Sequence, residues 1–312
     1  MPKYKDFLAQ QLENNRDILL LTAENRAPFR GLEDTFSDRI IDVGIAEQAM
    51  VGMAAGLALR GRRPIVHALA AFLSMRAFEF IRTDIGYPGL PVVLMGTIAG
   101  VLSECNGPTH QALEDIALMR GIPGMGVFCP AHEGELTEGL EQILTQEQPF
   151  YVRYNDRPDT YTSDYQKSSF ELGNADVWKN HSARTSEVTI LTYGVMCEPA
   201  LECAGMLCAE NITTEVINLH TLIPLDNEAV LKACAQSTLC VTLEDHFLTG
   251  GLYSIVAELL LQSHITARVS PIAFDKQWFT PSFLPALLEH HQISAHHLAR
   301  RVKQLLKGDD CK

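Results

Sequence analysis

The sequence predicts an α/β protein with two parallel-sheet domains. Short apolar runs alternate with segments of helical periodicity along most of the 312 residues, an order that is typical of parallel sheets covered by helices on both faces. The alternation stops in a polar stretch rich in Asp, Ser, Thr and Asn, and then resumes. The length also suits about two domains of ordinary size. We therefore expect a first domain over residues 1–154, a linker over 155–187 and a smaller second domain over 188–312.

The first domain is expected to contain five buried strands with helices between them. The strands are predicted from apolar runs at residues 17–22, 63–70, 90–97, 125–130 and 149–154. The helices are predicted near residues 43–60, 72–86, 109–121 and 132–145. Gly61 and Gly121 follow two of these helices, and glycine is favoured just past a helix end.

The second domain repeats the alternation without an obvious repeat of the first domain's sequence. Its strands are predicted at residues 187–194, 213–219, 239–245 and 267–274. Its helices are predicted near residues 197–210, 226–236 and 250–263. This order again indicates a mostly parallel sheet.

The composition excludes several classes of partner. The formal charge of −13 disfavours nucleic acid and anionic membrane, because each attracts a basic face. No apolar run reaches the ~20 residues that a membrane-spanning helix needs, and the first residues contain no apolar signal-peptide core. The eight cysteines include no C-x-x-C pair. We therefore expect a cytoplasmic protein with reduced thiols and no metal site of its own.

One acidic residue lies in an unusual setting. The segment IIDVGIAEQAMVGMAAGLALRG (residues 40–61) places Glu47 in the first turn of a helix made almost wholly of small and apolar residues. Acids in a first turn are often stabilised only by the helix dipole, by ~0.3–1 kcal/mol. The small neighbours of Glu47, however, let another chain or helix approach closely. A carboxyl group desolvated in this way needs a proton or a basic partner, so Glu47 is a candidate functional residue.

Three motifs give the chain a resemblance to a known family. DVGIAEQAMVGMAAGLALRG is followed by AFLSMRAFEFIRTDIGYP and then by GPTHQALEDIALMRGIPGM. In this order the motifs closely resemble the transketolase family of thiamine-diphosphate (ThDP) enzymes, and specifically the pyrimidine-binding domain plus the C-terminal domain. The resemblance covers roughly residues 1–306. It implies transfer of a two-carbon ketol, or a related acyl-anion unit, between carbonyl compounds.

The resemblance implies roles for residues around the cofactor ring. Glu47 matches the glutamate that bonds a ring nitrogen of the aminopyrimidine and favours the imino tautomer, whose nitrogen deprotonates the thiazolium carbon. Phe72 matches the aromatic residue that stacks on this ring. Met75 and Phe78 fall where relatives have further ring contacts, although core packing explains these two equally well. Glu24 lies where an acid in relatives helps to organise the site between chains, and an ordinary loop acid is the alternative.

A histidine matches a substrate-contacting position. His110, in GPTHQ, matches a family histidine near the substrate hydroxyls. It precedes an expected helix, where a neutral imidazole is favoured. We expect His110 to position substrate or to shuttle a proton, with simple helix capping as the alternative.

The motif that holds Mg²⁺ and the diphosphate in complete relatives, Gly-Asp-Gly followed at a distance by Asn, is absent from the sequence. The chain begins with Met, and its first strand is expected by residue 17. It therefore resembles the C-terminal subunit of a split transketolase. This implies an N-terminal partner subunit that carries the Gly-Asp-Gly…Asn site, with two copies of each subunit. We expect the isolated chain to be inactive and not to bind ThDP tightly.

Several substrate positions depart from the family pattern. Ile98 stands where relatives have a histidine that contacts the sugar phosphate. Cys105 and Asn106 replace two acids, and Asn106 keeps an acceptor but loses the charge. The family's phosphate-binding arginine falls at or near Asp156, with Arg157 one residue on.

The remaining candidate cations for an anionic substrate are Arg26, Arg76 and Arg153. Losing one charged phosphate contact typically costs ~2–3 kcal/mol if the group stays buried. We therefore expect a non-standard donor or acceptor, unless a one-residue shift of the loop lets Arg157 reach a phosphate.

Other interpretations remain open. The beta subunit of a 2-oxo-acid dehydrogenase and a deoxyxylulose-phosphate-synthase-like enzyme would use the same glutamate, and a non-catalytic scaffold subunit would only pair with a ThDP-binding chain. The segment EHHQISAHHLARR (residues 289–301) contains four histidines that could ligate a metal. No carboxylate joins them at helical spacing, so a solvated helix face is the preferred interpretation.

Overall fold

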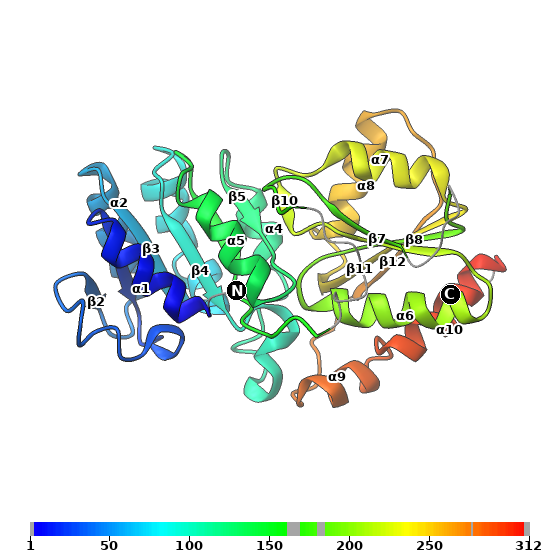
Figure 1. Ribbon diagram of the computed structural model, residues 1–312, viewed down its shortest axis with the longest axis horizontal. Helices are drawn as coiled ribbons and strands as arrows, with labels where there is room; N and C mark the ends of the chain where they lie inside the picture. The colour runs from blue at the N-terminus through cyan, green and yellow to red at the C-terminus, as the bar shows by residue number, and fades with distance from the viewer. Residues whose placement is uncertain (1–2, 161–168, 180–184, 276, 309–312) are drawn as a thin grey trace.

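Two β-sheets lie side by side along the long axis of the molecule, and helices pack on both (Figure 1). The computed structural model describes residues 3–160, 169–179, 185–275 and 277–308. Both sheets are mostly parallel, so the predicted fold class is confirmed. Within these described ranges, every helix is too short or too polar to cross a membrane.

The first sheet has seven strands in the order β10-β5-β6-β4-β3-β1-β2. Its strands are β1 (Ile18–Thr22), β2 (Ile40–Asp42), β3 (Arg63–Leu69), β4 (Val93–Thr97), β5 (Gly126–Phe128), β6 (Phe150–Arg153) and β10 (Thr221–Ile223). The helices of this half are α1 (Tyr4–Asn14), α2 (Glu47–Leu59), α3 (Phe78–Phe80), α4 (Asp115–Arg120) and α5 (Glu133–Ile143). Strands β4 and β6 are buried at every residue, as continuous apolar runs in parallel sheets predict.

The second sheet has five strands in the order β12-β11-β8-β9-β7. Its strands are β7 (Asp176–Lys179), β8 (Val188–Thr192), β9 (Thr214–Asn218), β11 (Leu239–Phe247) and β12 (Val269–Phe274). Its helices are α6 (Cys197–Ala209), α7 (Asn227–Gln236), α8 (Leu252–Gln262), α9 (Leu284–His290) and α10 (Ala295–Leu306). Asp226 caps the N-terminus of α7 by accepting a hydrogen bond from the Ala229 N–H, and aspartate is favoured at this position.

A strand from the second half of the chain completes the first sheet. Strand β10 pairs antiparallel with β5, with Thr221 opposite Phe128 and Ile223 opposite Val127. One buried hydrophobic cluster then continues from Val127 into Leu219 and Leu222. Shared burial therefore fixes the position of the two halves relative to each other. The sequence does not predict β10, because three residues are too few to show a strand period.

The predicted linker, residues 155–187, contains a strand. Strand β7 pairs antiparallel with β9, with Val177 opposite Ile217, and its residues alternate between buried and exposed. The linker prediction is therefore wrong for residues 176–179, because a short, partly polar edge strand gives no apolar run. Residues 161–168 and 180–184 of the predicted linker lie outside the described residues.

A buried arginine joins the two halves electrostatically. Arg153, the last residue of β6, has a side chain only 7% exposed. Its Nε donates to Asp115 Oδ2 at 2.9 Å, and its Nη1 donates to Asp245 Oδ1 on β11. Burial raises the pKa of Asp245, and the nearby guanidinium opposes that shift. Arg153, a candidate substrate cation from the sequence, is thus engaged in a structural ion-pair network.

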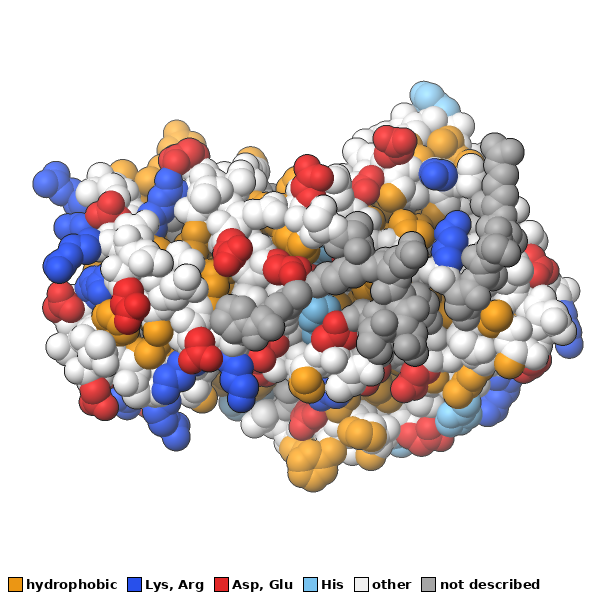
Figure 2. Space-filling view, viewed as in Figure 1, with side chains coloured by type: hydrophobic (Ala, Val, Ile, Leu, Met, Phe, Trp, Pro, Cys, Tyr) orange, Lys and Arg blue, Asp and Glu red, His pale blue; other side chains and the backbone are white. Residues whose placement is uncertain are grey.

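Acidic side chains are spread over the face of the molecule in Figure 2, whereas many of the basic ones gather toward the end formed by α2 and β2. This face presents no broad basic surface, in keeping with the formal charge of −13.

Replacing Arg153 should strongly destabilise the fold. Arg153→Met leaves two buried carboxyl groups without a cation, and removing one partner of a buried pair costs about 3–5 kcal/mol. The free energy of unfolding from denaturant titration measures the loss. Arg62→Met is the control, since it breaks a half-exposed pair with Asp17 and should cost no more than about 1 kcal/mol. Equal losses of unfolding free energy in the two variants would contradict the structural role of the buried Arg153 ion pairs.

Candidate functional site

A cavity of about 520 Å³ opens at the carboxyl ends of the central strands of the first sheet. Its walls include residues at or just after the ends of β1, β3, β4 and β6: Asn25, Leu69, Thr97, Ile98, Tyr154 and Arg157. Ligands of open parallel α/β sheets bind in crevices at this edge. The cavity is therefore the natural place for a small substrate.

Glu47 is the first residue of α2 and is almost fully buried. Gly44, with φ +71°, turns the chain out of β2, and the helix begins after Ala46. The side chain of Glu47 is 2% exposed, and its two carboxylate oxygens accept hydrogen bonds from Arg76 Nη1 at 3.1 and 2.9 Å. The basic partner that the sequence demands is therefore Arg76. The helix N-terminus further favours the negative charge.

Phe72 lies directly under this ion pair. The Cζ atom of Arg76 is 4.2 Å from the centre of the Phe72 ring, a cation–π contact. Residues Phe72–Arg76 form a π-helical turn, a rare conformation that is frequent at functional sites. Phe72 packs against a small cluster that includes Ala71 and Ala99. Ala71 follows Leu69 of the cavity wall by two residues and Ala99 follows Ile98 by one, whereas Phe72 itself does not line the cavity.

His110 also contacts the Phe72 ring. Their ring centres are 5.1 Å apart in an edge-to-face arrangement, and His110 Nδ1 lies 2.9 Å from Thr109 Oγ1. The sequence predicts a helix from residue 109, but α4 begins only at Asp115, so that start is wrong and His110 does not cap a helix. The structure therefore brings Glu47, Phe72 and His110 into one group: Arg76 connects Glu47 to Phe72, and Phe72 contacts His110.

Met75 and Phe78 lie on the same segment as Phe72. Met75 is 37% exposed, while Phe78 is half-buried and packs against the main core cluster. No helix of regular α geometry runs through residues 72–86, because two π-helical turns flank the short α3. Part of the Phe78 side chain thus packs against the core and part stays accessible, whereas Met75 is more open to a ligand or a partner.

Glu24 and Arg26 lie in the loop after β1. Arg26 Nε forms an ion pair with Asp42 Oδ2 at 3.1 Å. The Glu24 N–H points to the same carboxylate, at 3.4 Å from Oδ1. Glu24 has φ +59°, and its exposed side chain has no hydrogen bond or ion pair with another described residue. Neither Glu24 nor Arg26 is brought into contact with Glu47.

The proposed substrate residues separate into two groups. Arg157 lines the cavity, and its Nη2 forms an ion pair with Glu198 Oε2 at 3.6 Å. Ile98 and Asp156 also line the cavity, where the departures from the family pattern place them. Asn106 instead donates a hydrogen bond to the Ser103 carbonyl at 2.7 Å and lies outside the cavity wall.

Two residues of the cavity wall, Glu104 and Asn25, escaped sequence reasoning, and the backbone of Ile98 is also unusual. Glu104 has φ +45° and Ile98 has φ +51°. A positive φ is rare for a β-branched residue, and such strained residues often cluster at functional sites. Asn25, also in the wall, donates a hydrogen bond from Nδ2 to Thr97 Oγ1. No sequence pattern signals these conformations, apart from the irregular composition of the loops.

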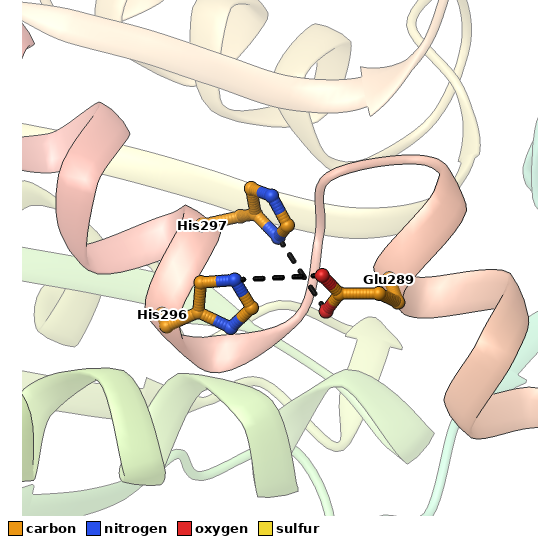
Figure 3. Close-up of side chains that lie close together, drawn as sticks. All are labelled: Glu289, His296 and His297. Carbon is orange, nitrogen blue, oxygen red and sulfur yellow. Dashed lines mark ion pairs between the residues drawn. The ribbon is translucent and has the colours of Figure 1, made fainter.

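A second cluster of titratable groups lies on the second domain (Figure 3). Glu289 approaches His296 Nε2 at 3.5 Å and His297 Nδ1 at 3.7 Å. Ser294 Oγ lies 2.9–3.2 Å from all three side chains. Sequence spacing does not reveal Glu289, because it comes from the end of α9. These hydrogen bonds between largely exposed groups account for the geometry of the cluster.

Comparison with known families covers nearly the whole chain. Residues 4–157 match the family described as "Transketolase, pyrimidine binding domain", and residues 178–298 match "Transketolase, C-terminal domain". The chain therefore belongs to the transketolase family, with its pyrimidine-binding domain followed by its C-terminal domain.

Individual relatives support the same assignment. The chain is 37% identical over 259 residues to the 6-deoxy-6-sulfo-D-fructose transketolase subunit SqwH of Clostridium sp. (strain MSTE9), covering 82% of this chain and 79% of that protein. It is 33% identical to 1-deoxy-D-xylulose-5-phosphate synthase of Heliobacterium modesticaldum, over 88% of this chain but only 42% of the synthase. A solved structure described as "Split gene transketolase, inactive beta4 tetramer" superposes with a TM-score of 0.85 at 34% identity, over 97% of each chain. The resemblance to a split transketolase subunit is confirmed.

Proposed function

We propose that this chain is the C-terminal subunit of a two-component, ThDP-dependent enzyme that transfers a two-carbon ketol unit between carbonyl compounds. The observation that carries the proposal is the pairing of a buried carboxylate, Glu47, with an aromatic face, Phe72. A flat group with N–H donors fits between them, and the Arg76 guanidinium already takes that position. An acceptor carboxylate beside an aromatic face therefore suits an aminopyrimidine ring, which is flat and carries N–H donors.

Glu47 and Phe72 would hold the ring. Glu47 accepts a hydrogen bond from a ring nitrogen, and Phe72 stacks on the ring face. ThDP supplies, when bound, a nucleophilic carbon for attack on the carbonyl of the ketol donor. Met75 and Phe78 are proposed as further ring contacts, and Glu24 as an acid that organises the site between chains.

His110 is proposed to transfer a proton to or from a substrate hydroxyl. Its Nδ1 is next to Thr109 Oγ1, which leaves Nε2 without a partner among the residues that the structure describes. An imidazole with one free nitrogen can accept or donate a proton at a substrate hydroxyl. Asn106, Arg26 and Arg157 are proposed to contact the rest of the substrate, with Arg157 in the cavity wall.

The surface beside Glu47 supports a partner subunit. Ile45, Met53, Met75, Phe80 and Tyr87 are 76, 42, 37, 38 and 91% exposed. These residues come from α2, the residues just before it, and the segment over residues 72–87 that packs against α2. Exposed apolar surface of this kind is typical of protein interfaces. We propose that an N-terminal transketolase subunit covers them and brings the Gly-Asp-Gly…Asn site for Mg²⁺ and the diphosphate. The assembly would contain two copies of each subunit and work in the cytoplasm.

The isolated chain should bind ThDP weakly and show no turnover, because its sequence contains no Gly-Asp-Gly motif for the diphosphate and Mg²⁺. The related split-gene structure, described as an inactive tetramer of one subunit, supports this expectation. Calorimetric titration of ThDP and Mg²⁺ into the chain, with and without the partner subunit, measures the difference. Robust turnover by the chain alone would contradict the two-component proposal.

Replacing Glu47 in the reconstituted complex should lower kcat by about 10²–10⁴-fold, the range that a positioned proton-transfer group contributes. Glu47→Gln keeps the shape of the side chain and removes the carboxylate. Glu13→Gln, an exposed acid on α1, is the matched control and should keep the wild-type rate. A retained rate in Glu47→Gln would instead support a scaffold subunit.

The cavity points to a donor with a single negative charge. Arg157 is its one cation among the described lining residues, and Glu104 and Asp156 lie in the same wall. A phosphate monoester carries about −1.5 to −2 charges at neutral pH, whereas a sulfonate carries one. The Clostridium relative is named for 6-deoxy-6-sulfo-D-fructose. We propose a sulfonated or similarly monoanionic ketose as donor.

The reconstituted complex should therefore prefer 6-deoxy-6-sulfo-D-fructose to fructose 6-phosphate by at least about tenfold in kcat/KM, a difference of about 1.4 kcal/mol. Arg157→Met should reduce the rate with the sulfonated sugar more than with unphosphorylated fructose. Comparable rates with xylulose 5-phosphate and ribose 5-phosphate, near those with the sulfonated donor, would contradict the proposal.

The similarity to the Heliobacterium synthase favours one second candidate, a deoxyxylulose-phosphate-synthase-like reaction. Pyruvate and glyceraldehyde 3-phosphate, offered to the same complex, distinguish it. Carbon dioxide release with this pair, and no turnover of ketoses, would identify the second candidate.

A further inference from the structure

Arg76 occupies the place that the proposed function assigns to the cofactor ring. Its Nη1 lies 3.1 and 2.9 Å from the two carboxylate oxygens of Glu47. Its Cζ lies 4.2 Å from the centre of the Phe72 ring. One side chain of this protein therefore makes both contacts by which the ring would be held.

The two groups have the same recognition chemistry. A guanidinium is flat and delocalised, carries its N–H donors in its plane and stacks on aromatic faces. An aminopyrimidine is also flat, has in-plane N–H donors and stacks on aromatic faces. Both cannot lie between Glu47 and Phe72 at once. We infer that the Arg76 guanidinium fills the position between the Glu47 carboxylate and the Phe72 ring, here named the seat, and leaves it when the cofactor binds. This inference rests on the proposed function for the identity of the incoming ring.

The local structure lets the side chain move while the backbone stays. The Arg76 carbonyl accepts a hydrogen bond from Gln48 Nε2 at 3.2 Å, which ties this segment to α2. The Arg76 side chain is 43% exposed, in contrast to 2% for Glu47. Its guanidinium can therefore turn out to solvent without any change of fold, whereas the carboxylate has no such path.

The exchange keeps Glu47 paired in both states. Among the described residues, Arg76 is the only recorded side-chain partner of Glu47. An unpaired buried carboxylate is costly, so Arg76 holds Glu47 in place until the ring supplies a new donor. Arg76 is thus a positioning residue that competes with the cofactor. The apparent dissociation constant for ThDP then equals the intrinsic constant divided by the fraction of molecules whose seat is free.

Equilibrium binding of ThDP to the reconstituted complex tests the competition. Arg76→Met keeps an unbranched apolar stem but removes the guanidinium with its donors. It should tighten ThDP binding by about tenfold if one seat in about ten is free in the wild type. Arg16→Met, an exposed arginine outside the site, makes the same charge change and should leave the affinity unaltered. Equal or weaker binding by Arg76→Met would overturn the inference.

A second measurement tests the seat without the cofactor. In the full chain carrying Arg76→Ala, millimolar methylguanidinium should refill the seat and raise the thermal midpoint by about 1–2 °C, with no rise in the wild type or in Arg16→Ala. No selective rise would overturn Arg76 as an occupant. If no variant of the complex binds ThDP, the proposed function fails and the competition with it. If the wild type binds ThDP and Arg76→Met binds it no better, only the competition fails.

Discussion

A carboxylate buried at the start of a helix must always face a donor, and this constraint on Glu47 organises the site. The side chain is 2% exposed, so bulk water cannot supply hydrogen-bond donors to the carboxylate. The helix N-terminus helps, but the two oxygens also need N–H groups in their plane. Phe72 limits those groups to flat ones, because its ring forms the floor beneath them. The shape of the place beside Glu47 therefore selects a planar, nitrogen-rich group, whether it comes from this chain or from a ligand.

The second domain shapes the cavity at the end of the first sheet, although it contributes none of the described lining residues. The loop after β4 lines the cavity through Ile98 and Glu104 and also contacts β11. Gly100, in this loop, has φ +55°, and a Cβ there would lie 1.8 Å from an Asp245 carboxylate oxygen. Only glycine permits this approach. Asp245 in turn pairs with Arg153, so the buried ion pairs that join the domains also hold the cavity wall.

The apolar runs predict the long strands and helices well, because burial on both faces of a parallel sheet leaves a continuous hydrophobic signal. Strands β2, β7 and β10 are short or polar and leave none. Within the site, the family motifs identify Glu47, Phe72 and His110. They do not reveal that Arg76 joins the first two, since Glu47 and Arg76 lie far apart in the chain and meet only in the fold. Nor does the sequence show that Arg153 is buried between two carboxylates.

An experimental structure of the chain with its partner subunit, Mg²⁺ and ThDP tests the account most directly. The distance from the Glu47 carboxylate to the nearest nitrogen of the aminopyrimidine is the deciding quantity. We expect a hydrogen bond of about 2.6–3.2 Å, with the ring stacked on Phe72 and the Arg76 side chain turned away from both Glu47 and Phe72. A bound cofactor whose ring lies elsewhere, with Glu47 still paired to Arg76, would contradict it.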